Sequence, residues 1–139
     1  MPTRTRRELD EIQEIVERYL TMVARHCGDT DYTEVCREVS RHPKYKGFTT
    51  RDADDRRELR GILGRISEGT YKKYGVLLTA IVWQRWGGVR IKSVGDGFWT
   101  MAVGCGRLTE EPEDDQKEEV LQALVDEVHV AYARRVLSN

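Results

Sequence analysis

Residues 65–88 read RISEGTYKKYGVLLTAIVWQRWGG, in which a charged helical pattern ends at Gly75 and an almost continuous apolar run follows. The run from Val76 to Trp83 has Thr79 as its one polar residue and is rich in β-branched and aromatic side chains. Short apolar runs of this kind favour a strand that is covered on both faces. We therefore predict a buried strand over residues 76–83.

The next residues predict the second half of a β-hairpin. Residues 84–88 read QRWGG, whose paired glycines favour a turn. The segment from Val89 to Lys92 then alternates apolar and basic side chains with the period of two that a half-exposed strand shows. We expect Arg85, Arg90 and Lys92 to lie on the exposed part of this hairpin.

Three helices are predicted before the apolar run. The first covers residues 5–27, because a capping-box pattern at residues 5–8 precedes apolar residues at helical spacing. A short second helix covers residues 32–39, with Tyr32 on its apolar face. A third covers residues 54–67, and its basic residues lie mostly away from its apolar face: Arg56, Arg57, Arg60 and Arg65.

Two glycines interrupt the third helix. Gly61 and Gly64 each destabilise a helix interior by roughly 1 kcal/mol relative to alanine. We expect them to permit the close approach of another backbone. Beyond Ser67 the apolar pattern loosens, so the sequence predicts only a further short turn of helix before Gly75.

The C-terminal part of the chain predicts two more helices. Gly95, Asp96 and Gly97 offer a turn and a cap for a short buried helix that ends within residues 104–106. After an acidic linker, a long helix over residues 115–137 carries an apolar stripe. The stripes of the first and last helices either pair with each other or form a dimer interface, and the sequence leaves both arrangements open.

The composition is that of one soluble domain over residues 1–139. Hydrophobic residues make up 39% and charged residues 34% of the chain, and no stretch is long and apolar enough to span a membrane. The first residues lack the apolar segment of a secretory signal. Three widely spaced cysteines do not indicate a disulfide framework. We expect a cytoplasmic protein with no membrane partner.

Charge is distributed unevenly along the chain. Residues 41–92 contain 13 Lys and Arg against 5 acidic residues, whereas residues 1–40 contain 6 against 9 and residues 93–139 contain 4 against 10. A localised positive field allows a small, nearly neutral domain to bind a polyanion. The alternative is that acidic and basic segments neutralise each other in the fold.

No motif predicts catalysis or a cofactor. Glycine-rich phosphate loops are absent, and the histidines lack a recognisable partner for nucleophilic chemistry. A zinc site can be assembled from His26, Cys27, Cys36 and His42, but their spacing lacks the C-x-x-C pair that pre-forms half a site. Asp96 is either a turn or cap residue or an acid of a metal-dependent nuclease. We expect no cofactor and no bound metal.

The order of helix, loop, basic helix and hairpin is typical of a winged helix. In that fold a short helix braces a recognition helix in the major groove, while basic residues of the hairpin meet phosphates. Residues 32–39 would be the bracing helix and residues 54–67 the recognition helix. We predict an α+β, mostly helical fold with a winged-helix-like core over about residues 29–106, flanked by the two long terminal helices.

A resemblance implies the same architecture. The segments LRGILGRIS, GVLLTAIVWQ and GDGFW are similar to an uncharacterised set of bacterial and phage domains with a leucine-glycine helix, an apolar strand and a G-x-G-F turn. Residues 32–36 and 59–66 distantly resemble the C-terminal winged helix of the O6-alkylguanine DNA alkyltransferases. The Pro-Cys-His-Arg reactive strand of that family is matched by residues 78–81, which contain no thiol. The resemblance therefore implies DNA docking without dealkylation.

These patterns lead to one functional hypothesis and one alternative. The hypothesis is a non-enzymatic, DNA-binding protein of winged-helix type, in a phage or mobile-element setting. Its contacts with double-stranded DNA would come from seven basic residues: Arg56, Arg57, Arg60, Arg65, Arg85, Arg90 and Lys92. The alternative is a protein-protein interaction module that uses its acidic terminal helices, as a homodimer or with a different partner.

Overall fold

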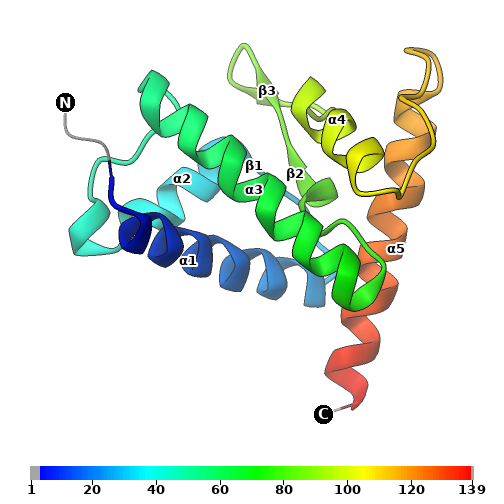
Figure 1. The fold of residues 1–139 in the computed structure, drawn as a ribbon, viewed down its shortest axis with the longest axis horizontal. Helices are drawn as coiled ribbons and strands as arrows, with labels where there is room; N and C mark the ends of the chain where they lie inside the picture. Colours follow the sequence, from blue (N-terminus) through cyan, green and yellow to red (C-terminus); the bar gives the residue numbers. More distant parts are fainter. Residues whose placement is uncertain (1–3, 139) are drawn as a thin grey trace.

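Five α-helices supply most of the ordered structure in the computed structural model, which describes residues 4–138 (Figure 1). In chain order the elements are α1 (Arg6–Arg25), β1 (Thr30–Asp31), α2 (Tyr32–Ser40), the 3-10 helix η1 (Pro43–Tyr45), α3 (Ala53–Tyr74), the 3-10 helix η2 (Leu78–Ile81), β2 (Val82–Trp83), β3 (Arg85–Trp86), β4 (Val89–Arg90), α4 (Asp96–Gly104) and α5 (Lys117–Ser138). The prediction of a mostly helical α+β fold is confirmed.

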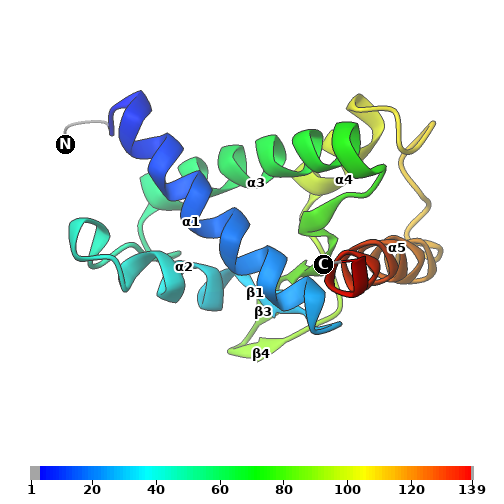
Figure 2. The same ribbon diagram turned by 90° about the horizontal axis from the view of Figure 1, so that it is seen from below.

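The two terminal helices pack against each other. The C-terminal end of α1 meets α5 in both views (Figure 1 and Figure 2). The apolar stripe of α1, which includes Val16 and Leu20, is buried in the same core as Leu121 and Val128 of α5. Of the two arrangements that the sequence left open, pairing within the chain is therefore the one observed. The capping box at Thr5 is present, and both helices begin and end within two residues of their predicted bounds.

The apolar run after α3 does not form one continuous strand. Its middle, Leu78–Ile81, is the 3-10 helix η2, and the strand β2 contains two residues, Val82 and Trp83. The prediction of a strand over residues 76–83 is therefore wrong. Nearly every side chain of the run is buried, and a run without alternation gives no periodicity that separates a strand from a tight helical turn.

Hydroxyl groups of α3 fix the backbone of this run. The Thr70 hydroxyl donates to the carbonyl of Val76 at 2.9 Å and accepts from the N–H of Leu78 at 3.2 Å. The Ser67 hydroxyl accepts from the N–H of Thr79 at 3.0 Å and shares a 2.6 Å hydrogen bond with the Thr79 hydroxyl. Because a helix supplies these partners, the backbone does not need a neighbouring strand to satisfy its polar groups.

The helix α3 is longer than predicted. It continues without a break from Ala53 to Tyr74, whereas the sequence predicted residues 54–67 and a separate short turn. The polar pattern after Ser67 is misleading because Thr70 is buried beneath the apolar run. Gly75 ends the helix with a φ of 74°, a left-handed conformation that favours glycine.

Two small β-pairings lie beside the helices. Strand β1 pairs in parallel with β2, and β3 pairs antiparallel with β4, with Arg85 opposite Arg90. The predicted hairpin therefore exists, but its first strand is β3 rather than the apolar run. Its turn residues, Gly87 and Gly88, have φ values of 58° and 81°, as a two-residue hairpin turn requires.

The glycines inside α3 do not serve close packing. A Cβ atom built on Gly64 would meet no atom within 4 Å, and one built on Gly61 would meet a guanidinium nitrogen of Arg65 at 3.5 Å. The expectation that another backbone approaches α3 at these positions is therefore wrong.

No helix between residues 4 and 138 combines the length and the apolar character that crossing a membrane requires.

Candidate ligand-binding cavity

The seven residues predicted to contact nucleic acid are divided between different environments. Arg56, Arg60 and Arg85 line one cavity. Arg57 forms an ion pair with Asp54, one turn earlier on the same helix. The other three contact other elements: Arg65 bonds to Gln13, Arg90 to Asp29 and Asp31, and Lys92 to Gln122. The alternative of mutual neutralisation therefore applies to part of the basic segment.

Two of these arginines anchor the hairpin to the start of α2. The buried carboxylate of Asp31 lies 3.1 Å from Nε of Arg85 and 2.9 Å from Nε of Arg90. Burial tends to raise the pKa of Asp31, but hydrogen bonds from the Glu34 N–H and the two guanidiniums outweigh it and lower the pKa. Asp31 is therefore ionised, and it reduces the positive charge that the hairpin presents.

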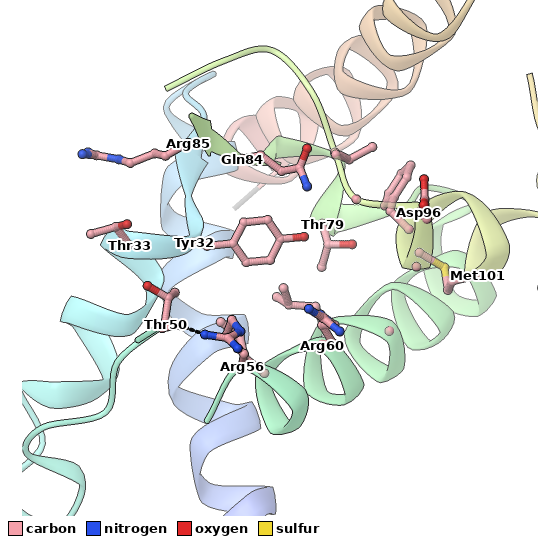
Figure 3. Close-up of a pocket in the computed structure, with 17 residues that line it drawn as sticks. Tyr32, Thr33, Thr50, Arg56, Arg60, Thr79, Gln84, Arg85, Asp96 and Met101 are labelled. Carbon is pink, nitrogen blue, oxygen red and sulfur yellow. Dashed lines mark hydrogen bonds between the residues drawn. The ribbon is translucent and has the colours of Figure 1, made fainter. Parts of the chain in front are cut away.

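A cavity of about 560 Å³ opens between the first turns of α2 and α3, the start of β3 and the start of α4 (Figure 3). Side chains from segments far apart in the sequence line it, including Tyr32 of α2, Arg60 of α3, Gln84 before β3 and Asp96 of α4. Its volume is within the range of small-molecule sites.

The α3 wall of the cavity carries two guanidinium groups without a carboxylate partner. Arg56 donates one hydrogen bond, to the carbonyl of Thr50 at 2.7 Å. Arg60 forms no hydrogen bond or ion pair with any residue that the structure describes. Both side chains are exposed at the cavity, so their remaining N–H groups face solvent or a ligand.

Tyr32 points into the middle of the cavity, with its hydroxyl directed between Thr79 and Arg60 (Figure 3). Burial raises the pKa of Tyr32, against the opposing effect of the Arg60 charge. The phenol is therefore neutral near pH 7 and can donate as well as accept a hydrogen bond. Within residues 4–138 its hydroxyl has no hydrogen-bond partner.

The opposite wall supplies an amide, a carboxylate and the start of a helix. The side-chain carbonyl of Gln84 accepts from the Ser93 hydroxyl at 3.2 Å, and its amide nitrogen faces the cavity (Figure 3). Asp96 is the first residue of α4, and its carboxylate accepts no hydrogen bond from the described part of the chain. The cap residue, Gly95, provides no side-chain hydrogen bond. Its carbonyl accepts from the Phe98 N–H at 3.0 Å, and the N–H groups of Asp96 and Gly97 have no acceptor in the described part of the chain.

Apolar side chains complete the lining. Leu59 and Leu63 come from α3, Val94 precedes α4, and Phe98 and Met101 lie on α4. Leu59, Leu63, Val94 and Phe98 are almost fully buried, so this side of the cavity is part of the hydrophobic core. The cavity therefore combines hydrogen-bond donors at one side with an apolar surface at another.

Acidic and metal-ligating side chains are sparse around the described part of this cavity. Asp96 is the one carboxylate among the described residues that line the cavity. No three His, Cys, Asp or Glu residues between positions 4 and 138 are grouped so as to hold a metal ion, and this includes the four residues considered for zinc. Burial raises the pKa of the Cys36 thiol to about 12, which leaves it a poor nucleophile.

The sequence identified part of this cavity. It singled out Asp96, and structurally that residue is the first of α4. It missed Gln84, which it assigned to a turn, and it placed Tyr32 on an apolar helix face. The available signal was the position of Tyr32. It directly follows the N-cap Asp31, so its side chain starts from the first turn of the helix.

No protein-family model matches the chain, and no curated protein and no solved structure matches it significantly. The function is therefore inferred from the cavity itself.

Proposed function

We propose that the protein binds, in this cavity, a ligand that carries a phosphate or a comparable oxyanion. The observation that supports the proposal is Arg60, whose guanidinium lines the cavity and has no partner within residues 4–138. Arg56 adds N–H donors beside it. A guanidinium is always charged and matches the oxygens of a phosphate in a two-pronged geometry.

The other polar groups favour an organic anion over a bare ion. The Tyr32 hydroxyl, the Gln84 amide and the N–H groups of Asp96 and Gly97 add donors, which suit a ligand with several acceptor oxygens. The Asp96 carboxylate repels an anion and instead accepts from a hydroxyl or an amine. The ligand therefore carries an oxyanion at one end and a hydrogen-bond donor elsewhere.

The test is isothermal titration with phenyl phosphate, which joins a phosphate to a flat apolar ring. We expect the Arg60→Ala variant to bind about tenfold or more weakly than the wild type, because a charge-assisted hydrogen bond contributes about 1.5–3 kcal/mol. The matched control is Arg18→Ala, which removes the same charge from an exposed pair with Glu14 on α1. Equal affinities for both variants would contradict the proposal.

A second candidate function is the winged-helix type of DNA binding expected from the sequence. One observation favours it: Arg56, Arg57 and Arg60 are all exposed on the first turns of α3, ahead of the hairpin. In this proposal these three residues meet the phosphates, while Arg85 and Arg90 contribute less because they share Asp31.

Titration of duplex DNA over a range of salt concentrations tests this candidate. Removing Arg56 and Arg60 together should flatten the salt dependence by about one unit of slope for each phosphate that the variant no longer neutralises. The control removes Arg6 and Arg18, which are paired with acids on α1. If both double variants keep the wild-type slope, α3 does not contact the DNA backbone.

A further inference from the structure

We propose that the ligand of the cavity is a ribonucleotide, bound as a single unit with its phosphate at Arg56 and Arg60 and its base against the apolar side. This inference rests on the proposed function, because it identifies the rest of the ligand molecule that carries the oxyanion. A free nucleoside monophosphate and one unpaired nucleotide of an RNA strand share this chemistry, and the experiment below distinguishes them.

The apolar lining requires more than a phosphate. Leu63, Val94, Phe98 and Met101 border the same cavity as the two arginines. A flat heterocycle that binds here excludes water from these apolar side chains, whereas a sugar phosphate leaves them exposed to water. The volume of about 560 Å³ is within the range of about 300–1,000 Å³ that small-molecule sites occupy.

Gly64 leaves the α3 wall bare where a flat ring would lie. It lines the cavity, and a Cβ atom there would meet nothing within 4 Å, so packing inside the protein does not require the glycine. A glycine also destabilises a helix interior. A bare backbone allows a ligand to approach α3 more closely than any side chain would. Gly69, on the same helix, has equally open space but does not line the cavity.

Gln84 has the donor that one edge of an adenine requires. A glutamine amide N–H donates to N7 of that base. The Ser93 hydroxyl holds the carbonyl of Gln84 at 3.2 Å and leaves its amide N–H groups without a partner in the described chain. A Cβ atom at position 95 would lie 3.4 Å from this amide nitrogen, so the amide lies beside the start of α4.

Asp96 suits the sugar. Its carboxylate has no hydrogen-bond partner among residues 4–138, and a ribose provides hydroxyl donors. A carboxylate that accepts from a ribose hydroxyl is a recurrent arrangement in nucleotide sites. The sugar therefore lies on the α4 side of the cavity, and the phosphate lies on the α3 side.

The experiment is isothermal titration of the full chain with adenosine monophosphate and three analogues that each lack one part. Deoxyadenosine monophosphate lacks the 2′-hydroxyl of the ribose, ribose 5-phosphate lacks the base, and adenosine lacks the phosphate. We expect each analogue to bind about tenfold or more weakly than adenosine monophosphate, because the absence of even one hydrogen bond to a charged group weakens binding by about this factor.

The outcomes separate this inference from the proposed function. If ribose 5-phosphate binds as tightly as adenosine monophosphate, the nucleotide inference is overturned while an Arg60-dependent oxyanion site stands. If phenyl phosphate and every phosphorylated probe bind without dependence on Arg60, the proposed function fails as well. A single-stranded oligoadenylate that binds more tightly than the free nucleotide identifies an RNA strand as the source, and the reverse order identifies the free nucleotide.

A matched pair of variants places the base against α3. Gly64→Leu should weaken binding of adenosine monophosphate about tenfold or more, because its side chain occupies the proposed position of the ring. Gly69→Leu should bind like the wild type, and both variants should keep the wild-type circular dichroism spectrum. Equal affinity in the two folded variants would overturn the proposed position of the base.

Discussion

The guanidinium of Arg90 lies 2.9 Å from the buried carboxylate of Asp31, and this contact joins the β3–β4 hairpin to the start of α2 across 59 positions of sequence. The same carboxylate accepts from the N–H of Glu34 at 2.9 Å and so caps α2. Asp31 therefore positions both α2, which carries Tyr32, and the hairpin that follows Gln84. Two sides of the cavity depend on it.

The Asp31→Asn substitution should lower the free energy of unfolding by about 1–3 kcal/mol, because it removes the buried charge that Arg85 and Arg90 share and leaves Arg90 with Asp29 alone. Asparagine is still a good N-cap, so the lost stability reflects the contacts of Asp31 with Arg85 and Arg90 rather than a weaker α2. Urea unfolding measures the change. The control, Glu14→Gln, breaks an exposed pair on α1 and should change stability by less than about 1 kcal/mol. Similar losses in both variants would contradict the anchoring role.

Stability should fall in acid partly because of Asp31. Its pKa is lowered from the ordinary value of 3.8, so the folded state favours the ionised form. This stabilisation is present above the ordinary pKa and is lost as the pH falls below about 4, through the lowered value. We expect the unfolding free energy of Asp31→Asn to depend less on pH in this range. Parallel curves for the two proteins would show that Asp31 does not contribute.

The Thr70→Val substitution should destabilise the protein by about 1–3 kcal/mol, since it leaves the buried N–H of Leu78 without an acceptor. Valine keeps the shape of the side chain, so the loss reports the hydrogen bonds. Thermal unfolding provides the measurement. Thr100→Val, at an exposed position of α4, is the control and should be nearly neutral. An equal effect at both positions would mean that Thr70 does not fix the apolar run.

The thiols should differ sharply in reactivity. Burial raises the pKa of Cys36 to about 12, whereas Cys27 is exposed. A disulfide reagent at mildly alkaline pH should modify Cys27 in the native protein and Cys36 only after unfolding. Mass spectrometry of the derived peptides identifies the modified residue. Native modification of Cys36 at the rate of Cys27 would contradict its burial.

Local signals predicted the helices well. The capping box at Thr5 marked a helix start that the structure confirms. The run from Val76 to Trp83 failed as a strand because its partners are hydroxyls of Ser67 and Thr70, which nothing in the run itself reveals. Patterns within one segment predict an element, but they do not show which neighbour satisfies its backbone.

The cavity was harder to predict than the helices. Counting charges identified Arg56 and Arg60 but could not separate them from Arg90, whose partner Asp31 is distant in the sequence. Gln84 and Tyr32 carry no distinctive spacing, and only the fold, which places α2, α3 and the segment before β3 around one cavity, brings them to one site. Site residues that are brought together by long-range contacts can therefore be identified only from the structure.

The measurement that most directly tests the oxyanion site is the dissociation constant of phenyl phosphate for three proteins: the wild type, Arg60→Ala and Arg60→Lys. The site predicts the tightest binding for the wild type, an intermediate constant for lysine, which keeps the charge but not the two-pronged geometry, and a loss of about tenfold or more for alanine. The same constant for all three folded proteins would contradict an oxyanion site at Arg60.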